Sequence, residues 1–352
     1  MSAVHPDFLT VFAAVKVLSP TAYRFHDELR EFPGPIPPAS DPVFLPALEG
    51  ELYSRLYTRP TSSGAPVDYL AQRDHISALS AANNGHGTWE PGWQIMALEP
   101  DGRFSVRKGG ITFWVGPDGL RVRNGTPAPG AYCRVRVAKE LRSLMPGFYC
   151  AIGNGDENDT RDAPAPLVRF YWHLTPGAAV PYIAAITSRL NQRGVPFRTK
   201  VLSAPNEYGR ADAGVLYLER RHTTRLGDTL SAVHREIAAG LRPEVPLFSR
   251  ALAPGLAVAE SPGVELSFGQ HRCQLAARAV WASFTRGDTT PEQQAATCAE
   301  VVRAANLDPV RPHLEPGSSS DKYSFVPPPG RARVVRGAPS GRAKGKRKER
   351  LT

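Results

Sequence analysis

The chain has 352 residues, of which 41% are hydrophobic and 22% are charged, a composition typical of a folded protein of one or two domains. No run of 18 apolar residues occurs, which excludes a membrane-spanning helix, and residues 1–18 lack the basic start and apolar centre of a secretory signal. The formal net charge of +10 is concentrated in residues 331–352, which hold nine Lys or Arg and one Glu. The body therefore has a net charge of only +2 and no strong signal of nucleic-acid binding. We predict a disordered basic tail over 316–352, for which contact with RNA or an acidic peptide is the alternative.

The four cysteines are scattered along the chain without C-x-x-C spacing: Cys133, Cys150, Cys273 and Cys298. One of them, Cys273, lies two residues after His271, and the others have no histidine at the spacing of a zinc site. This usage fits a reducing compartment, so we expect a cytoplasmic protein with four buried, small, apolar side chains. We expect no metal and no organic cofactor.

The first 150 residues combine helical patterns with a β-meander. Residues 1–30, 50–58 and 69–82 have helical spacing of apolar side chains, and 31–46 is a proline-rich loop. Five β-prone runs follow, separated largely by Pro-Asp-Gly and Gly-Gly turns: 93–99, 103–108, 111–115, 120–124 and 131–137. We predict that this N-terminal region, 1–150, is a candidate for peptide recognition. Three tryptophans fit either the core of the meander or a peptide groove: Trp89, Trp93 and Trp114.

The second half alternates strands and helices after a polar boundary at 153–166. Strands are expected at 168–174, 197–202, 215–219 and 264–268, and helices at 177–192, 226–241, 270–284 and from Thr290 onward. We predict an α+β domain over 151–315, with a mixed or antiparallel sheet and flanking helices.

Cations gather on one face of the predicted strands. Because side chains alternate along a strand, Arg169, Tyr171 and His173 share one face of the first strand, and Arg198 and Lys200 share a face of the next. The helix between the two strands places both in one sheet. Later segments add further polar side chains near this face: Asn206, Tyr208, Arg210 and Arg272.

Four or five cations on a packed face need an anion, because uncompensated buried charges cost several kcal/mol each. A phosphate dianion suits arginine forks. The alternative is a solvated face on which Glu207, Asp212 and Glu219 neutralise the arginines. Partial burial among arginines would lower the pKa of Lys200 and make it a candidate base, with His173 as the candidate acid. Alone, His173 would be read as a structural histidine.

The sequence resembles the HopA-type effector family over most of residues 50–280. The resemblance is carried by seven short segments: Leu79-Ser80-Ala81-Ala82-Asn83 followed by Gly92-Trp93, Val106-Arg107-Lys108-Gly109, Phe170-Tyr171-Trp172-His173, Pro196-Phe197-Arg198-Thr199-Lys200, Tyr208-Gly209-Arg210-Ala211-Asp212 and Ser267-Phe268-Gly269. This domain also occurs in actinobacterial gene clusters for thioamitides and class V lanthipeptides. There, the resemblance implies a lyase that removes phosphate from phosphoserine or phosphothreonine of a ribosomal precursor peptide, after a separate kinase-like protein has phosphorylated it. A cyclase is a further implied partner.

The second half also resembles bacterial phosphothreonine lyases in the order of its charged residues. That order reads His173, Arg198, Lys200, Arg210 and Arg272, and Tyr171 replaces the lysine that those lyases carry two residues before the histidine. The resemblance implies Lys200 as base and His173 as acid. It implies that the phosphate is bound by Arg169, Arg198, Arg210 and Arg272, with Lys108 joining them. Three residues are candidates for binding the peptide itself: Tyr171, Asn206 and Tyr208.

Three other functions stay open on the sequence. The first is a non-catalytic binding partner of a modifying kinase, which would recognise the phosphopeptide through the same cations. The second is an effector-like protein of type III secretion, against which the absence of a serine-rich export segment argues. The third is nucleic-acid binding through the basic tail.

Overall fold

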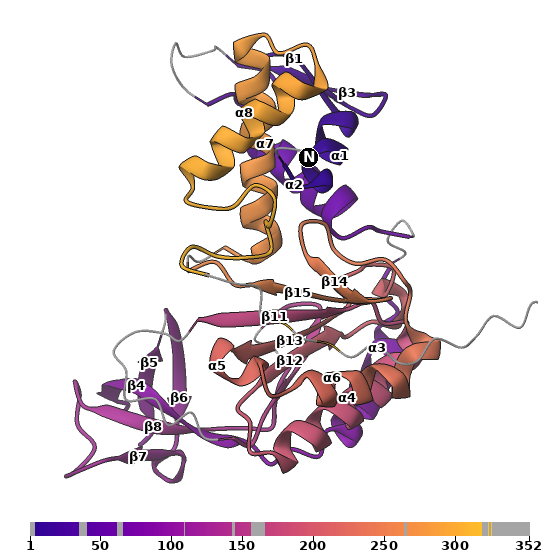
Figure 1. Ribbon diagram of the computed structural model, residues 1–352. Coiled ribbons are helices and arrows are strands. Elements are labelled where there is room, and N and C mark those ends of the chain that lie inside the picture. The colour runs from indigo at the N-terminus through magenta and orange to yellow at the C-terminus, as the bar shows by residue number, and fades with distance from the viewer. Residues whose placement is uncertain are drawn as a thin grey trace, which may run out of the picture.

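The computed structural model describes residues 4–34, 41–61, 66–108, 110–142, 145–155, 166–263, 266–318, 323 and 325. These residues form three antiparallel sheets with flanking helices, an α+β architecture (Figure 1). Most of the predicted tail over 316–352 and most of the polar boundary at 153–166 lie outside them. In the described part, no helix is long and apolar enough to cross a membrane.

A seven-stranded sheet lies at the centre of the molecule. All of its strand pairs are antiparallel, in the order β14-β15-β11-β13-β12-β10-β9. Its strands are β9 (Glu140–Leu141), β10 (Phe148–Ile152), β11 (Leu167–Trp172), β12 (Arg198–Leu202), β13 (Gly214–Glu219), β14 (Arg250–Ala253) and β15 (Leu256–Glu260). The predicted boundary at residue 150 falls inside β10.

One face of the central sheet is covered by three helices: α3 (Tyr69–Ala82), α4 (Pro176–Gln192) and α6 (Gly227–Ile237) (Figure 1). Phe170 and Trp172 of β11 point to this face and enter a core with Ile183 and Ile186 of α4. Proline at the start of α4 and Gly194 at φ +62 after it set the bounds of that helix, close to the prediction. Short helical turns complete this layer: α5 (Arg220–Thr223), η3 (Pro205–Glu207) and η4 (Ala238–Gly240).

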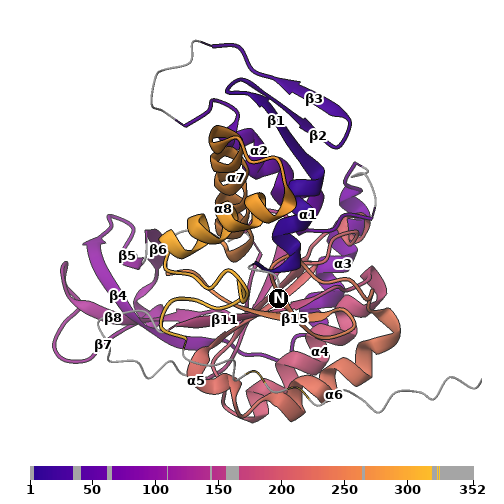
Figure 2. The ribbon, with the colours of Figure 1, turned by 45° about the horizontal axis from the view of Figure 1, so that its top comes forward.

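The opposite face carries a lobe built from both ends of the chain (Figures 1 and 2). Its helices are α1 (Pro6–Ala14), α2 (Leu45–Glu51), the π-helix η1 (Leu52–Tyr57), α7 (Phe268–Arg286) and α8 (Pro291–Ala304). Its small sheet has the strands β1 (Val15–Ser19), β2 (Ala22–Phe25) and β3 (Glu28–Glu31). The expected helix over 1–30 is therefore wrong beyond Ala14, because Val15–Ser19 alternates buried and exposed side chains with period two.

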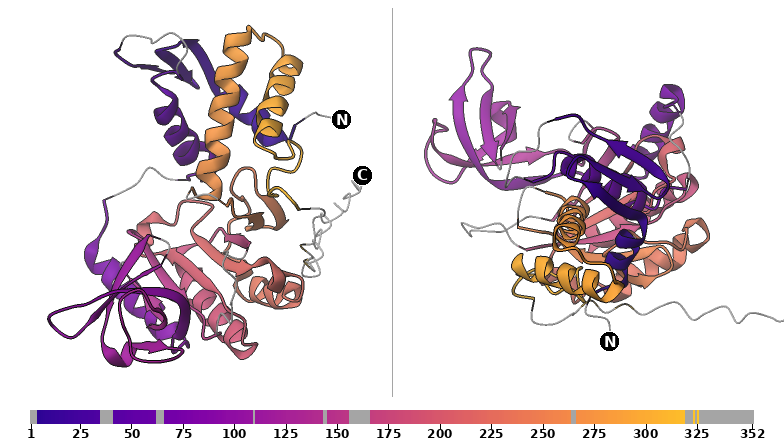
Figure 3. Two further views of the ribbon diagram at one scale, coloured as in Figure 1. Left: turned by 90° about the vertical axis from the view of Figure 1, so that its left-hand side faces the viewer. Right: turned by 90° about the horizontal axis from the view of Figure 1, so that it is seen from above.

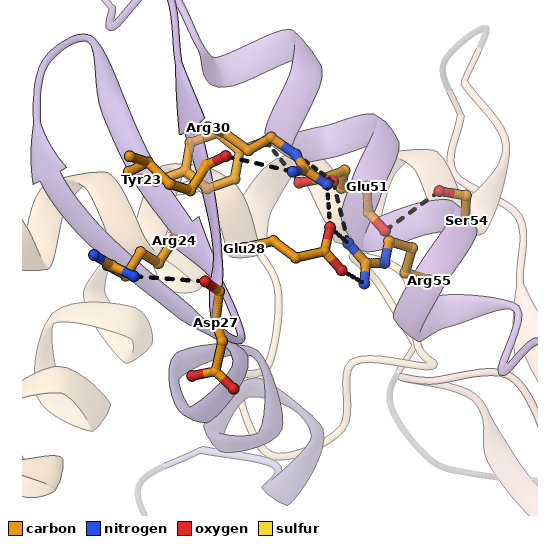
Figure 4. A network of polar contacts seen from close by, with 9 residues as sticks. Tyr23, Arg24, Asp27, Glu28, Arg30, Glu51, Ser54 and Arg55 are labelled. Atoms are coloured by element: carbon orange, nitrogen blue, oxygen red, sulfur yellow. Dashed lines mark hydrogen bonds and ion pairs between the residues drawn. The ribbon is translucent and has the colours of Figure 1, made fainter.

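Ion pairs fix the small sheet to α2 and η1 (Figure 4). Arg30 contacts Glu51 at 2.8 Å, and Arg55 contacts Glu28 at 2.7 Å. The Tyr23 hydroxyl donates to Glu51 at 2.8 Å. This network connects the β2–β3 hairpin to the π-helix, and the π-helix in turn faces the central sheet.

A five-stranded sheet projects to one side of the central sheet (Figures 1 and 3). Its order is β6-β5-β4-β8-β7. The predicted hairpins β4–β5 and β5–β6 form and 131–137 joins the sheet, but a continuous meander is wrong, because β8 pairs with β4 and places β7 at the edge opposite β6. The strands are β4 (Thr88–Leu98), β5 (Phe104–Lys108), β6 (Ile111–Val115), β7 (Leu120–Val122) and β8 (Tyr132–Val137), with the turn η2 (Pro117–Gly119). The side chains of Trp93, Ile95 and Val106 fill its core.

The strand expected at 264–268 does not form as predicted. Residues 264–265 lie outside the described chain, and Phe268 already belongs to α7. A reciprocal pair of hydrogen bonds between Ser267 and Gln270 caps that helix, and this local signal outweighs the β-prone composition. The hairpin β14–β15, which the sequence analysis missed, supplies the strands instead.

Candidate functional site

Lys200 lies at the centre of the sheet face that is turned toward the α7 lobe. The register pairs Lys200 of β12 with Val215 of β13, and Val215 with Tyr171 of β11. The next rung joins Arg198, Tyr217 and Arg169 in the same way. Directly paired residues share a face. The cations of the two strands therefore lie on one face, as predicted, although β13 separates the two strands.

The ammonium of Lys200 lies in a largely apolar setting. Its Nζ is 3.9 Å from the centre of the Phe148 ring, a cation–π distance. Burial lowers the pKa of Lys200 below its usual 10.5; Asp212 opposes this shift, and Arg169 and Arg210 add to it. Within the described chain no hydrogen bond or ion pair holds this ammonium. Such a lysine loses its proton at a lower pH than an exposed lysine does.

Arg169 and Tyr171 form the opposite side of the face. Arg169 Nε donates to Ser261 Oγ at 2.7 Å, and its guanidinium lies 5.3 Å from the Tyr217 ring. Arg169 makes no ion pair with a carboxylate of the described residues. The Tyr171 hydroxyl is buried next to Tyr57 and Arg169, both of which act on its pKa, but it makes no hydrogen bond of good geometry within the described chain. Burial raises the pKa of Tyr171, so this phenol keeps its proton.

His173 follows directly after β11 and is completely buried. Its Nδ1 lies 3.0 Å from the carbonyl oxygen of Glu244, and because a carbonyl only accepts, Nδ1 carries the proton. Nε2 is then a bare acceptor, and within the described chain it has no partner. Burial lowers the pKa of His173, and the Glu244 carbonyl and carboxylate oppose that shift. The isolated protein therefore holds a neutral imidazole with an unused lone pair.

Arg210 and Asp212 form a tight pair beside Lys200. Arg210 donates to both oxygens of Asp212, at 2.5 and 2.8 Å. Tyr53 of the π-helix donates its hydroxyl proton to Asp212 Oδ2 at 3.3 Å, and its ring stacks on Tyr57 at 5.1 Å. Asp212 acts on the pKa of both Lys200 and His173, raising each, so it belongs to the surroundings of both groups.

The π-helix brings two residues to the site that the sequence analysis did not single out, Tyr53 and Tyr57. Tyr57 meets the ring of Tyr171 edge-on at 6.5 Å. A Cβ on Gly269 of α7 would lie 2.4 Å from Tyr57 Cε1, so only glycine allows this approach. A π-helix is rare and is found preferentially at functional sites. The available signal was the spacing of two tyrosines four residues apart in a helical stretch.

Three of the predicted phosphate-binding residues have other partners. Arg198 and Lys108 both bind Glu90 of β4, Lys108 at 2.9 Å, and so connect the five-stranded sheet to β12. Arg272 is fully buried and binds the Pro312 carbonyl at 2.7 Å. It also binds the Leu314 carbonyl at 3.1 Å and the Glu315 carboxylate at 2.7 Å. In this structure these three cations hold segments of the chain together.

Two of the predicted peptide-binding residues also have structural partners. The Tyr208 hydroxyl donates to the Leu202 carbonyl at 2.5 Å and accepts from His75 Nε2 at 2.9 Å. Asn206 Nδ2 donates to the Pro66 carbonyl at 2.7 Å. The bonds to His75 and Pro66 fix the 205–208 turn against α3 and the segment before it. Tyr171 is thus the predicted peptide-binding residue that remains at the Lys200 face.

The described residues offer no group of three or more His, Cys, Asp or Glu side chains that could hold a metal ion. The four cysteines are buried and unpaired, as the sequence analysis expected. The polar chemistry of this region consequently lies with the lysine, the arginines, the tyrosines and His173.

The chain is similar to a known protein family and to solved structures. Residues 140–314 match the model of the HopA1 effector protein family, a span just under half of the chain that includes Lys200, Arg169 and His173. Two effector proteins of known structure are similar at 18% identity, one from Pseudomonas syringae pv. tomato strain DC3000 and one from Pseudomonas syringae pv. syringae strain 61. Their TM-scores are 0.45 and 0.46, and each alignment covers 76% of this chain and 90% of the other. No curated protein sequence matches the chain.

Proposed function

We propose that this chain, whose residues 140–314 form a HopA1 effector family domain, is a lyase that removes phosphate from phosphoserine or phosphothreonine of a peptide. The products are dehydroalanine or dehydrobutyrine in the peptide, and free phosphate. The phosphorylated substrate would come from a separate kinase-like protein acting on a ribosomal precursor peptide. A cyclase would then use the new double bonds.

One observation carries the proposal. Five cations were predicted to bind the phosphate and Lys200 to act as base, and in the described chain Arg169 and Lys200 are the two of these six that have no carboxylate partner. They lie on the same face of the sheet, on neighbouring rungs of strands separated by one strand, which puts their backbones about 12 Å apart. The small side chain of Val215 lies between Lys200 and Tyr171. An arginine that lacks an anion, beside a lysine with a lowered pKa, suits a phosphorylated substrate.

In the proposed reaction, Arg169 and the pair of Arg210 with Asp212 orient the phosphate. Neutral Lys200 takes the proton from Cα of the phosphorylated residue. The electrons of that C–H bond form the Cα–Cβ double bond, and the Cβ–O bond breaks with its electron pair leaving on phosphate. Negative charge that develops on the neighbouring amide oxygen is stabilised by a hydrogen bond from the Tyr171 hydroxyl.

His173 acts as the acid only after substrate binds. In the free protein its Nε2 is a bare acceptor and burial lowers its pKa. A bound phosphate dianion raises that pKa, because an opposite charge favours the protonated imidazole. The resulting imidazolium keeps its Nδ1 bond to Glu244 and gives the Nε2 proton to the departing phosphate. Binding of the phosphate dianion therefore protonates His173, and the protonated His173 is the acid that the leaving phosphate needs.

The test is incubation of the protein with a synthetic phosphothreonine peptide, followed by mass spectrometry for the loss of one molecule of phosphoric acid. We expect Lys200→Ala to reduce the elimination rate by about 100-fold or more, the typical contribution of a catalytic base. The matched control is Lys16→Ala, on an exposed position of β1. Binding of the phosphopeptide to Lys200→Ala, measured by fluorescence anisotropy, separates this proposal from the alternative of a non-catalytic binding partner. Elimination at the wild-type rate by Lys200→Ala would refute the assignment.

A further inference from the structure

The five-stranded sheet has one face that its own core does not use. Register places Trp93, Ile95 and Val106 on the inner side, where they form the core. The alternate positions point the other way, and we call this side the outer face. Seven of its side chains are arginines or aromatics: Trp89, Arg107, Trp114, Arg121, Tyr132, Arg134 and Arg136.

The outer face is exposed and carries one sign of charge. Trp114 is 54% exposed and Tyr132 is 70% exposed, and the side chains of Arg107, Arg121 and Arg136 are exposed as well. All positions that the register assigns to this face are described, and none of them is Asp or Glu. The guanidinium of Arg121 lies over the ring of Trp89 at 3.9 Å, a cation–π contact that holds this arginine in place.

This composition differs from that of an ordinary solvated sheet face. Solvated faces usually mix both signs of charge, whereas arginine with tryptophan and tyrosine is the composition enriched at the centres of protein interfaces. The sheet projects away from the central sheet in two views, which leaves the outer face open to a long partner (Figures 1 and 3).

We propose that the outer face binds an acidic, aromatic-containing segment of the peptide substrate, at a distance from the residue that reacts. Charge complementarity selects an acidic partner, because the exposed Arg107, Arg121 and Arg136 attract carboxylates of the ligand. This inference rests on the proposed function for the identity of the peptide as substrate, although the binding itself does not depend on catalysis.

The position of the five-stranded sheet supports a single peptide that occupies both places. Glu90 of β4 binds Arg198, which lies two residues before Lys200 on β12. Trp89, the neighbour of Glu90, is on the outer face, opposite Arg136. One chain bound on the outer face can thus continue past the start of β4 to the Lys200 face. Binding of the acidic segment then raises the local concentration of the phosphorylated residue at the site.

The experiment measures the affinity of a fluorescein-labelled peptide with several Asp and Glu residues and two aromatic residues for the full chain. Its control ligand replaces each Asp by Asn and each Glu by Gln. The tested variant is Arg107→Glu/Arg121→Glu/Arg136→Glu, and the matched variant, with the same change in net charge on exposed positions elsewhere, is Arg24→Glu/Arg193→Glu/Arg303→Glu. A milder set, Arg107→Gln/Arg121→Gln/Arg136→Gln, covers the case in which charge reversal unfolds the sheet, which circular dichroism reports.

We expect the tested variant to bind the acidic peptide about tenfold or more weakly, as three lost charge contacts would give, and the matched variant to bind nearly as the wild type does. The amide control peptide should bind weakly to all of them. Equal losses in the two charge-reversal variants, or no loss in the Gln set, would overturn the proposal. Displacement of the acidic peptide by lower concentrations of oligouridine than of unlabelled peptide would also overturn it, by assigning the face to RNA.

A second measurement separates this proposal from the proposed lyase function. A phosphothreonine peptide is prepared with and without the acidic segment, and elimination is compared between the two lengths. The preference for the longer peptide should fall about tenfold in the tested variant. If no elimination occurs in any protein, the lyase function fails, yet the anisotropy result still decides whether the outer face binds acidic peptides.

Discussion

Lys200 and Tyr171 lie on one rung of the central sheet, with Val215 of β13 between them. The lysine has a pKa lowered by burial, and the tyrosine has a buried hydroxyl next to Tyr57 and Arg169. A base and a hydrogen-bond donor about 10 Å apart across two strand spacings fit an amino acid residue between them. The predictions below test this relationship and the structures that hold it.

The burial of Lys200 predicts a specific dependence on pH. As a base, Lys200 must be neutral, so the elimination rate should rise with pH through its lowered pKa and then level off, well below pH 10.5. Lys200→Arg keeps its charge and should be inactive across the same range. The measurement is kcat/KM against pH for both proteins. A rate that rises only near pH 10.5 would contradict the lowered pKa.

The same burial has a consequence for stability. The unfolded chain binds a proton at Lys200 up to its usual pKa of 10.5, whereas the folded chain releases it at lower pH. In this window the unfolded state holds more protons, so the contribution of Lys200 to stability rises with pH. At neutral pH Lys200→Met removes a buried charge and should stabilise the fold by about 1 kcal/mol, seen as a higher Tm. A lower Tm would show that the ammonium has a stabilising partner.

Arg169→Gln should weaken phosphate binding more than Arg198→Gln does. Arg169 has no carboxylate partner in the described residues, whereas Arg198 is paired with Glu90. Loss of a hydrogen bond to a charged group costs about 1.5–3 kcal/mol, equivalent to an increase of about 10- to 100-fold in KM. The measurement is KM for a phosphothreonine peptide, together with inhibition by inorganic phosphate. A larger increase in KM from Arg198→Gln would contradict this prediction and would indicate that Arg198 binds the phosphate.

Gly269→Ala should disturb the site from a distance. The new Cβ would meet Tyr57 Cε1 at 2.4 Å, and Tyr57 is packed against Tyr171. We expect a destabilisation of about 1–3 kcal/mol from overpacking, and a loss of kcat larger than the change in KM. Gly177→Ala is the control, since a Cβ at that helical glycine meets nothing within 4 Å. Equal behaviour of the two variants would mean that the π-helix does not position Tyr171.

Glu90→Gln should loosen the attachment of the five-stranded sheet. Burial opposes ionisation of Glu90, but Arg198 and Lys108 outweigh it and lower its pKa below 4.5. Its contribution to stability is therefore present above pH 4.5 and is lost as the pH falls through the lowered pKa. Because both partners are partly exposed, we expect a loss of only about 1–2 kcal/mol at neutral pH. Glu99→Gln, in the same sheet, is the control, and Tm against pH is the measurement. A Tm difference between wild type and Glu90→Gln that persists at pH 2 would contradict this explanation.

The sequence determined the local structure in much of this protein. The helix over 69–82 begins and ends at the predicted residues, and the hairpins β4–β5 and β5–β6 form where the sequence predicts them. Alternation along 168–172 and 198–202 also placed Arg169, Tyr171, Arg198 and Lys200 on one face, because the side-chain period of a strand is two. These features depend on neighbours along the chain, which a single sequence displays.

Only the tertiary structure decided which cations are available to a ligand. Arg198, Lys108 and Arg272 look equivalent to Arg169 in the sequence, yet they bind Glu90 and Glu315, which lie 43 or more residues from the arginines they hold. Tyr53 and Tyr57 reach the site because the first and last parts of the described chain fold into one lobe. Ion pairs and packing between distant segments depend on the tertiary fold of the whole chain, and no local pattern of residues predicts them.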